Sequence, residues 1–147
     1  MSLLDTLQKD MIKAMKAHDK DTLEVVRMLK ASVKNEQIEK GHDLSKDEEI
    51  AVLKREDKQR KDSLADFKKA GRDDLIAKTK KELKVVEGYM PAQMSEDEVK
   101  AVIAQVIKDV DAKSMKDFGK VMGASMKKLN GRADGKVVNQ TVKSMLQ

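Results

Sequence analysis

The chain contains no cysteine and no tryptophan, one proline, and only three aromatic residues among its 147 amino acids. The lack of cysteine excludes disulfides, zinc–thiolate sites and thiol catalysis. Apolar residues are interspersed with charges, so no uninterrupted apolar run approaches the length of a membrane-spanning helix. The first residues lack the basic stretch and apolar block of a signal peptide. We therefore expect a soluble, cytoplasmic chain with no membrane contact.

Signals of catalysis are also scarce. The two histidines, His18 and His42, fall in expected loops, and neither has a second histidine at metal-ligand spacing. The glycine-rich P-loop pattern is absent. Residues 117–119 spell the Asp-Phe-Gly triplet of kinases, but the other kinase elements are missing, so we interpret them as a helix start. The sequence predicts no catalytic residue, no metal site and no cofactor.

Apolar residues recur with a period near 3.6 in every long segment and do not alternate over a sustained stretch. This pattern predicts an all-α protein. Pro91 disfavours helix at its own position and just before it, so we place a domain boundary there. The expected domains are a four-helix domain over residues 1–90 and a three-helix domain over residues 95–147. Capping signals predict helix starts at Ser2, Asp21, Ser45, Asp73, Ser95, Ser114 and Asp134 or Gly135.

The third expected helix has no apolar residue between positions 54 and 63. Extending the apolar stripe of this helix places Asp57 and Arg60 at core positions. We interpret the segment as a solvated face, supported by the i,i+4 ion pairs Glu56–Arg60 and Asp57–Lys61. The alternative is a partner or phosphate surface built on Arg55, Lys58, Arg60 and Lys61.

The formal net charge of +5 is concentrated near the end of the chain. Between residues 118 and 147, six basic residues face a single acidic residue, and the rest of the chain is balanced. A localised basic surface attracts polyanions, above all phosphate backbones. The scarcity of aromatic residues leaves no stacking platform for bases, so contacts to the backbone of a folded RNA fit best. The candidate nucleic-acid-binding residues are Lys120, Lys127, Lys128, Arg132, Lys136 and Lys143.

Two glycine patterns in the last third of the chain have alternative interpretations. Gly119 and Gly123 form a GxxxG spacing inside the sixth expected helix. Interior glycine lowers helix stability by about 1 kcal/mol relative to alanine, so we expect a flat face on which a neighbouring helix packs; backbone access for a ligand is the alternative. The segment 131–135, Gly-Arg-Ala-Asp-Gly, is either an ordinary turn or a phosphate site at the start of the seventh helix.

Several stretches together resemble the YqeY family, whose C-terminal part is shared with the tail of GatB, a subunit of the tRNA-dependent amidotransferase. The resemblance extends over essentially the whole chain. It departs from the family pattern at Lys127, where proline is expected, and at Met90, where leucine is commoner. The matching stretches are Val26-Arg27-Met28, Lys30-Ala31, Lys58-Gln59-Arg60-Lys61-Asp62-Ser63, Gly71-Arg72, Asp74-Leu75, Glu82-Leu83, Tyr89-Met90-Pro91, Gly119-Lys120-Val121-Met122-Gly123 and Gly131-Arg132-Ala133-Asp134-Gly135.

The resemblance implies a two-domain helical protein with a four-plus-three division. In the amidotransferase the related tail contacts tRNA, and some glutaminyl-tRNA synthetases carry a similar appended domain. The family is often described as a carbon–nitrogen ligase with glutamine as amido donor. We interpret that description as inherited from the larger protein, because this chain has neither an amidase nucleophile nor a kinase-like ATP site. We therefore expect a non-catalytic tRNA-binding module in translation. The alternative is a helical adaptor that docks on a synthetase or an amidotransferase core.

Overall fold

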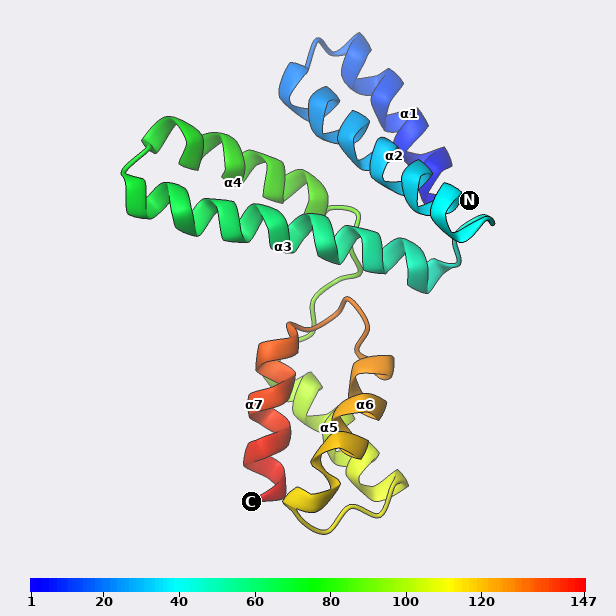
Figure 1. The fold of residues 1–147 in the computed structure, drawn as a ribbon, viewed down its shortest axis with the longest axis vertical. Coiled ribbons are helices and arrows are strands. Elements are labelled where there is room, and N and C mark those ends of the chain that lie inside the picture. Colours follow the sequence, from blue (N-terminus) through cyan, green and yellow to red (C-terminus); the bar gives the residue numbers. More distant parts are fainter. The chain divides into compact units, whose positions relative to one another are not determined.

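The computed structural model describes all 147 residues. It contains seven α-helices, one short 3-10 turn and no strand, which confirms the all-α class (Figure 1). No helix has the length and apolar character needed to cross a membrane. The elements are α1 (Leu3–Lys16), α2 (Lys20–Lys40), α3 (Lys46–Ala70), α4 (Asp73–Glu87), α5 (Glu96–Asp109), η1 (Met115–Asp117), α6 (Phe118–Lys128) and α7 (Gly135–Leu146).

Contacts along the chain group these elements into two compact units, Met1–Met90 and Pro91–Gln147. In the first unit, α1 and α2 form one helical hairpin and α3 and α4 form a second, and α2 packs on both helices of the second hairpin. The core of the first unit is aliphatic and comes from three of its four helices and the end of the fourth. Its buried residues are Leu7, Val25, Val26, Leu29, Val33, Val52, Leu53 and Val86.

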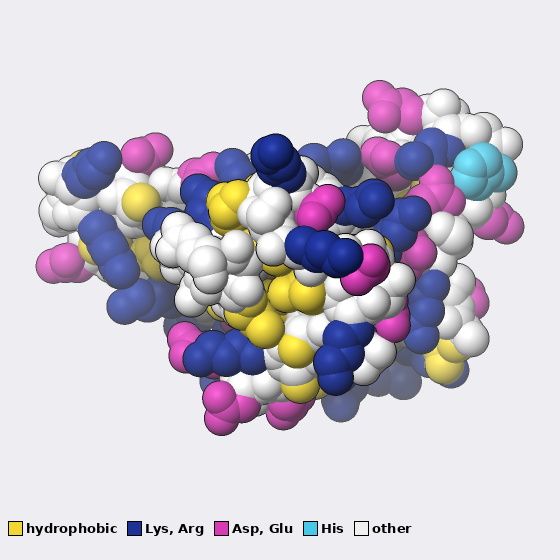
Figure 2. Space-filling view, turned by 90° about the horizontal axis from the view of Figure 1, so that it is seen from below, with side chains coloured by type: hydrophobic (Ala, Val, Ile, Leu, Met, Phe, Trp, Pro, Cys, Tyr) yellow, Lys and Arg dark blue, Asp and Glu magenta, His cyan; other side chains and the backbone are white.

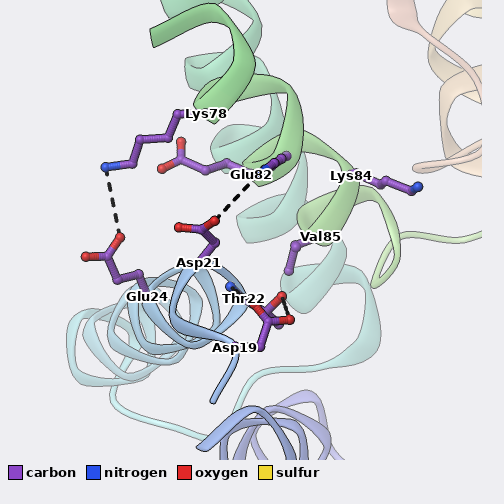
Figure 3. A pocket seen from close by; sticks show the side chains of 9 residues that line it. Asp19, Asp21, Thr22, Glu24, Lys78, Glu82, Lys84 and Val85 are labelled. Carbon is purple, nitrogen blue, oxygen red and sulfur yellow. Dashed lines mark hydrogen bonds and ion pairs between the residues drawn. The ribbon is translucent and has the colours of Figure 1, made fainter. Parts of the chain in front are cut away.

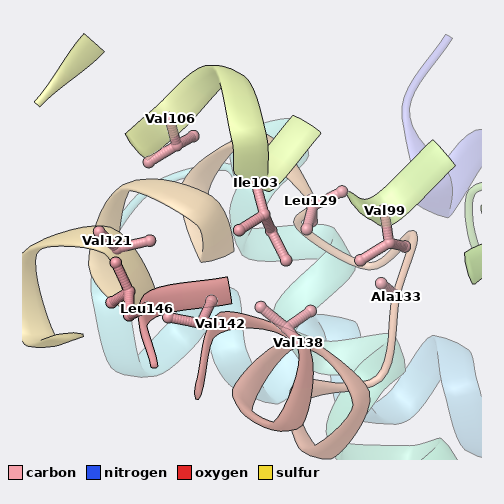
Figure 4. Packing of buried hydrophobic residues seen from close by; sticks show 9 residues of the cluster. All are labelled: Val99, Ile103, Val106, Val121, Leu129, Ala133, Val138, Val142 and Leu146. Atoms are coloured by element: carbon pink, nitrogen blue, oxygen red, sulfur yellow. The ribbon is translucent and has the colours of Figure 1, made fainter. Parts of the chain in front are cut away.

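In the second unit, α5, α6 and α7 each pack on the other two. Figure 4 shows their aliphatic side chains converging on Ile103, which has no exposed surface. The β-branched residues of α5 and α7 face this core, where packing outweighs their modest helix propensity. The buried set is Val99, Ile103, Val106, Val121, Leu129, Ala133, Val138, Val142 and Leu146.

The capping signals place most helix ends correctly. Ser2 and Ser45 form capping boxes with Asp5 and Glu48, and Ser95 accepts a hydrogen bond from the backbone N–H of Glu98. Two predicted starts differ from the structure. Asp19, rather than Asp21, caps α2, because its carboxylate accepts from the backbone N–H of Thr22 and so satisfies a free donor of the first turn.

Ser114 does not cap the sixth helix directly. It caps the 3-10 turn η1, and α6 begins only at Phe118. The tighter winding of a 3-10 turn changes the register of the apolar stripe. Met115 is therefore exposed, whereas Val121 and Ser125 are fully buried. The predicted stripe of Met115, Phe118 and Met122 was wrong in its first member, while Phe118 and Met122 are partly buried against the core.

The solvated-face interpretation of residues 54–63 was also wrong. Glu56, Asp57 and Arg60 are more than nine-tenths buried. The predicted i,i+4 pairs are present, with Arg60 Nη1 2.8 Å from Glu56 Oε2 and Lys61 Nζ 2.8 Å from Asp57 Oδ2. Ser32 of α2 donates to the second oxygen of Glu56 at 2.8 Å. A buried ionic network, rather than an apolar stripe, thus joins the middle of α3 to α2.

The last residues of the first unit are held by a single aromatic side chain. Tyr89 Oη donates a 2.6 Å hydrogen bond to Asp10 Oδ2 of α1. Burial, and then the hydrogen bond to the Asp10 carboxylate, raise the pKa of Tyr89 above its usual value of 10.0. The neutral phenol is therefore favoured in the folded state. Its contribution to stability is complete below pH 10 and is lost as the pH rises above that value.

This shift is measurable because Tyr89 is the only tyrosine and tryptophan is absent. We expect the phenolate absorbance of the folded chain to appear only above pH 10, and that of the urea-unfolded chain to have its midpoint near the usual value of 10.0. Asp10→Asn, which removes the negative charge facing the hydroxyl, is the matched variant and moves the folded midpoint down. Equal midpoints for folded and unfolded wild type would contradict the buried hydrogen bond.

Candidate nucleic-acid interface

The predicted nucleic-acid-binding residues all lie in the second unit, and all are exposed. The structure distributes them over α6, the following loop and α7. Basic and acidic side chains are interspersed on the face drawn in Figure 2, with hydrophobic side chains between them. The charge excess read from the sequence is therefore not a uniform cationic face there, and individual helix faces decide which cations are available to a polyanion.

Five of the six candidate cations form no side-chain ion pair: Lys120, Lys127, Arg132, Lys136 and Lys143. Lys128 is the exception, because its Nζ lies 3.4 Å from Asp109 Oδ2 at the end of α5. Hydrogen bonds from Gln105 and then from Lys128 hold the pKa of Asp109 below its usual value. Lys128 thus has a local partner and is the weakest candidate of the set.

Helical periodicity determines which cations share a face. In α6, Lys120 and Lys127 are seven residues apart and point in nearly the same direction. In α7, Lys136 and Lys143 have the same spacing. Lys116, one turn before Lys120, is also exposed and unpaired. The sequence analysis missed Lys116 because the charge count began at residue 118, although its i,i+4 spacing to Lys120 was visible.

The glycines of α6 do not make the close helix contact that the sequence suggested. A Cβ atom added at either Gly119 or Gly123 meets no atom within 4 Å, and both residues are exposed. The packing interpretation was therefore wrong. Each glycine lowers the helix propensity of α6 by about 1 kcal/mol relative to alanine, with no compensating contact inside the unit. Backbone access for a ligand is the alternative that remains.

The segment 131–135 forms a structured turn. Gly131 has φ of 72°, a left-handed conformation that favours glycine, and its carbonyl accepts a 2.8 Å hydrogen bond from Gln93 Nε2. The Met94 N–H donates to the carbonyl of Arg132 at 2.8 Å. Asp134 caps α7, because its Oδ1 accepts from the backbone N–H of Lys136 at 2.9 Å. A carboxylate already satisfies this helix start, so the structure favours the ordinary turn over the phosphate site.

The surface predicted from Arg55, Lys58, Arg60 and Lys61 needs correction. Arg60 is 5% exposed and belongs to the buried network, so it cannot contact a partner. Each of the other three has a carboxylate within 4 Å: Glu36 for Arg55, Asp62 for Lys58, and Asp57 for Lys61. These pairs reduce the attraction of this face for an anion.

One cavity of about 430 Å³ lies in the first unit, between the start of α2 and the face of α4. Figure 3 shows acidic side chains of α2 facing lysines of α4 across it. Lys78 pairs with Glu24 at 4.0 Å and Lys81 with Asp21 at 3.8 Å. Because the opposite charges largely balance, the cavity has no marked preference for either an anion or a cation. No group of three or more histidine or acidic side chains could hold a metal ion.

Comparison with known sequences extends over almost the whole chain. The sequence profile of the family described as "Yqey-like protein" matches residues 4–146. The chain belongs to the YqeY family. This confirms the resemblance drawn from the sequence.

Named relatives of this YqeY-family chain fall into two groups. "Altered inheritance of mitochondria protein 41, mitochondrial" of Kluyveromyces lactis is 36% identical over 71% of this chain and 58% of its own length. The protein of the same name from Pyrenophora tritici-repentis is 25% identical over 98% and 81%. A glutamyl-tRNA(Gln) amidotransferase subunit of Thermococcus sibiricus is 39% identical over 44% of this chain. The chain spans under three fifths of the Kluyveromyces protein and 11% of the Thermococcus protein.

Proposed function

We propose that this YqeY-family chain is a non-catalytic, tRNA-binding accessory module. The observation that carries the proposal is the set of five exposed cations in the second unit that have no carboxylate partner. Such cations bind a phosphate backbone with little reading of base sequence. The relationship to an amidotransferase subunit whose name includes glutamyl-tRNA supports tRNA as the RNA concerned. Amidotransferase subunits or aminoacyl-tRNA synthetases are then the proteins beside which the chain would act.

The proposal includes a division of labour between two domains. The four-helix unit and the three-helix unit each have their own aliphatic core. We propose that they fold as separate domains and that the second one holds the RNA. A cytoplasmic location stays a prediction, whereas the names of the fungal relatives include the word mitochondrial.

The test is the affinity of the full chain for tRNA as a function of salt. We expect tight binding at low salt and a steep linear fall of log K with log salt concentration. Changing Lys120, Lys127, Arg132 and Lys136 together to alanine removes four phosphate contacts and lowers this slope by about 3, at roughly 0.7–0.9 per contact. The readout is fluorescence anisotropy of labelled tRNA between low and physiological salt.

A matched control removes the same charge elsewhere. Lys9, Lys34, Lys80 and Lys84 are exposed, lie in the first unit and form no ion pair. Their alanine variant keeps most of the wild-type slope. Equal slopes for the two quadruple variants, or a wild-type chain that does not bind tRNA, would exclude the proposal.

A protein-interaction adaptor is the second candidate, and exposed apolar side chains of the first unit favour it. Ile38 is 78% exposed and Met28 is 49% exposed, both on α2. Exposed aliphatic residues on one helix are typical of a contact with another protein. A stable complex with a purified synthetase or amidotransferase core that survives nuclease treatment would favour the adaptor over the tRNA module.

A further inference from the structure

The exposed face of α6 combines positive charge with bare backbone. Gly119, Lys120, Gly123 and Lys127 are all exposed and lie within an arc of about 100° at 3.6 residues per turn. Lys116 of η1 extends the row by one turn. We call these five residues the α6 strip. It contains no carboxylate, and none of its lysines has an ion-pair partner.

The spacing of the cations indicates the shape of the ligand. Lys120 and Lys127 are about 10 Å apart along the helix axis, at 1.5 Å per residue. A single phosphate group cannot bridge this distance, whereas a chain of phosphates can contact each lysine in turn. The two glycines lie between and beside the lysines and present no side chain. A ligand backbone can therefore approach the helix backbone itself, as it could not over larger residues.

The chemistry of the strip favours nucleic acid backbone over bases. The strip has no aromatic residue on which a base could stack. Its lysines carry compact charges suited to phosphate oxygens rather than to planar groups. We propose that the α6 strip is the surface on which the sugar-phosphate backbone of RNA lies, with the two glycines permitting its close approach. This inference rests on the proposed tRNA-binding function and names the part of the second unit that performs it.

The decisive variant fills the bare surface without removing charge. Gly119→Leu/Gly123→Leu adds two side chains where a Cβ meets no atom within 4 Å, so the fold is retained and the better helix propensity of leucine raises Tm. We expect this variant to bind tRNA about tenfold more weakly or worse at fixed salt, because the phosphate backbone is held away from the helix. The control is Ala101→Leu on the exposed side of α5, which leaves affinity unchanged.

A second variant tests the cation that the charge count overlooked. Lys116→Ala lowers the slope of log K against log salt by about 0.7–0.9, as expected for one phosphate contact. Polyglutamate serves as competitor, since an acidic polypeptide is the other polyanion that a row of lysines attracts. We expect it to displace tRNA only at a large excess.

The outcomes separate this inference from the function on which it rests. If wild type binds tRNA and the glycine-to-leucine variant binds equally well with its Tm retained, the strip is not the contact, although the tRNA-binding function stands. If polyglutamate competes as well as free tRNA, the strip recognises acidic polypeptide rather than RNA. If wild type does not bind tRNA, the proposed function and this inference fail together.

Discussion

Arg60→Ala should lower the free energy of unfolding by about 3–5 kcal/mol. Arg60 Nη1 donates to the carboxylate of Glu56 at 2.8 Å and to its backbone carbonyl at 3.1 Å, and Glu82 Oε2 lies 3.7 Å from Arg60 Nε. Removing the guanidinium leaves the carboxylate of Glu56, a residue with 7% exposure, without a cation. The measurement is urea denaturation followed by circular dichroism.

A double variant shows whether burial of the unpaired charge is the cause. Glu56→Leu/Arg60→Met replaces both ions by apolar side chains of similar size, and we expect its stability to lie within about 1–2 kcal/mol of wild type. The single Arg60→Ala variant must then be much less stable than the double variant. A loss below about 1 kcal/mol in the single variant would show that water reaches this network and that the pair is not desolvated.

Ile103→Ala should lower the stability of the second unit by about 3 kcal/mol, within the usual range for a fully buried aliphatic residue. Ile103 has no exposed surface and lies at the centre of the α5–α6–α7 core. A domain as small as residues 91–147 has little stability to spare, so we expect it to unfold partly at room temperature. Circular dichroism then loses the helical signal of the second unit.

The single tyrosine makes this prediction a test of the two-domain proposal. Tyr89 belongs to the first unit, so its fluorescence reports on that unit alone, whereas circular dichroism reports on all helices. We expect the tyrosine transition of Ile103→Ala to coincide with that of wild type. Leu29→Ala, at a fully buried position of the first unit, is the matched variant and shifts the tyrosine transition instead. A common shift of both signals in Ile103→Ala would indicate one cooperative domain.

Local signals in the sequence predicted most of the secondary structure. Capping residues such as Ser2, Ser45 and Ser95 act over three or four residues, and Gly41 and Gly71 end helices through their own left-handed conformation. These effects depend on the chain nearby and therefore can be read from order alone. The apolar period likewise gave the buried positions of α5, where Val99, Ile103 and Val106 face the core.

The candidate site was only partly predictable. The count of charges placed the unpaired cations in the last part of the chain, because net charge is a property of composition. Whether each cation has a partner depends on residues distant in sequence, as in the pair of Lys128 with Asp109. The open space beside Gly119 and Gly123 likewise depends on where the neighbouring helices lie.

The sequence by itself determined the helical class, most helix ends, the family and the excess of positive charge near the C-terminal end. The tertiary structure decided that Glu56, Asp57 and Arg60 are buried, and which face of α6 is turned to solvent. The physical reason is the same in both cases. A charged residue at a core position is stable only if a partner such as Ser32 or Glu82 meets it, and a glycine is exposed only if no helix covers it. Both conditions are set by packing between helices, which periodicity along one helix does not contain.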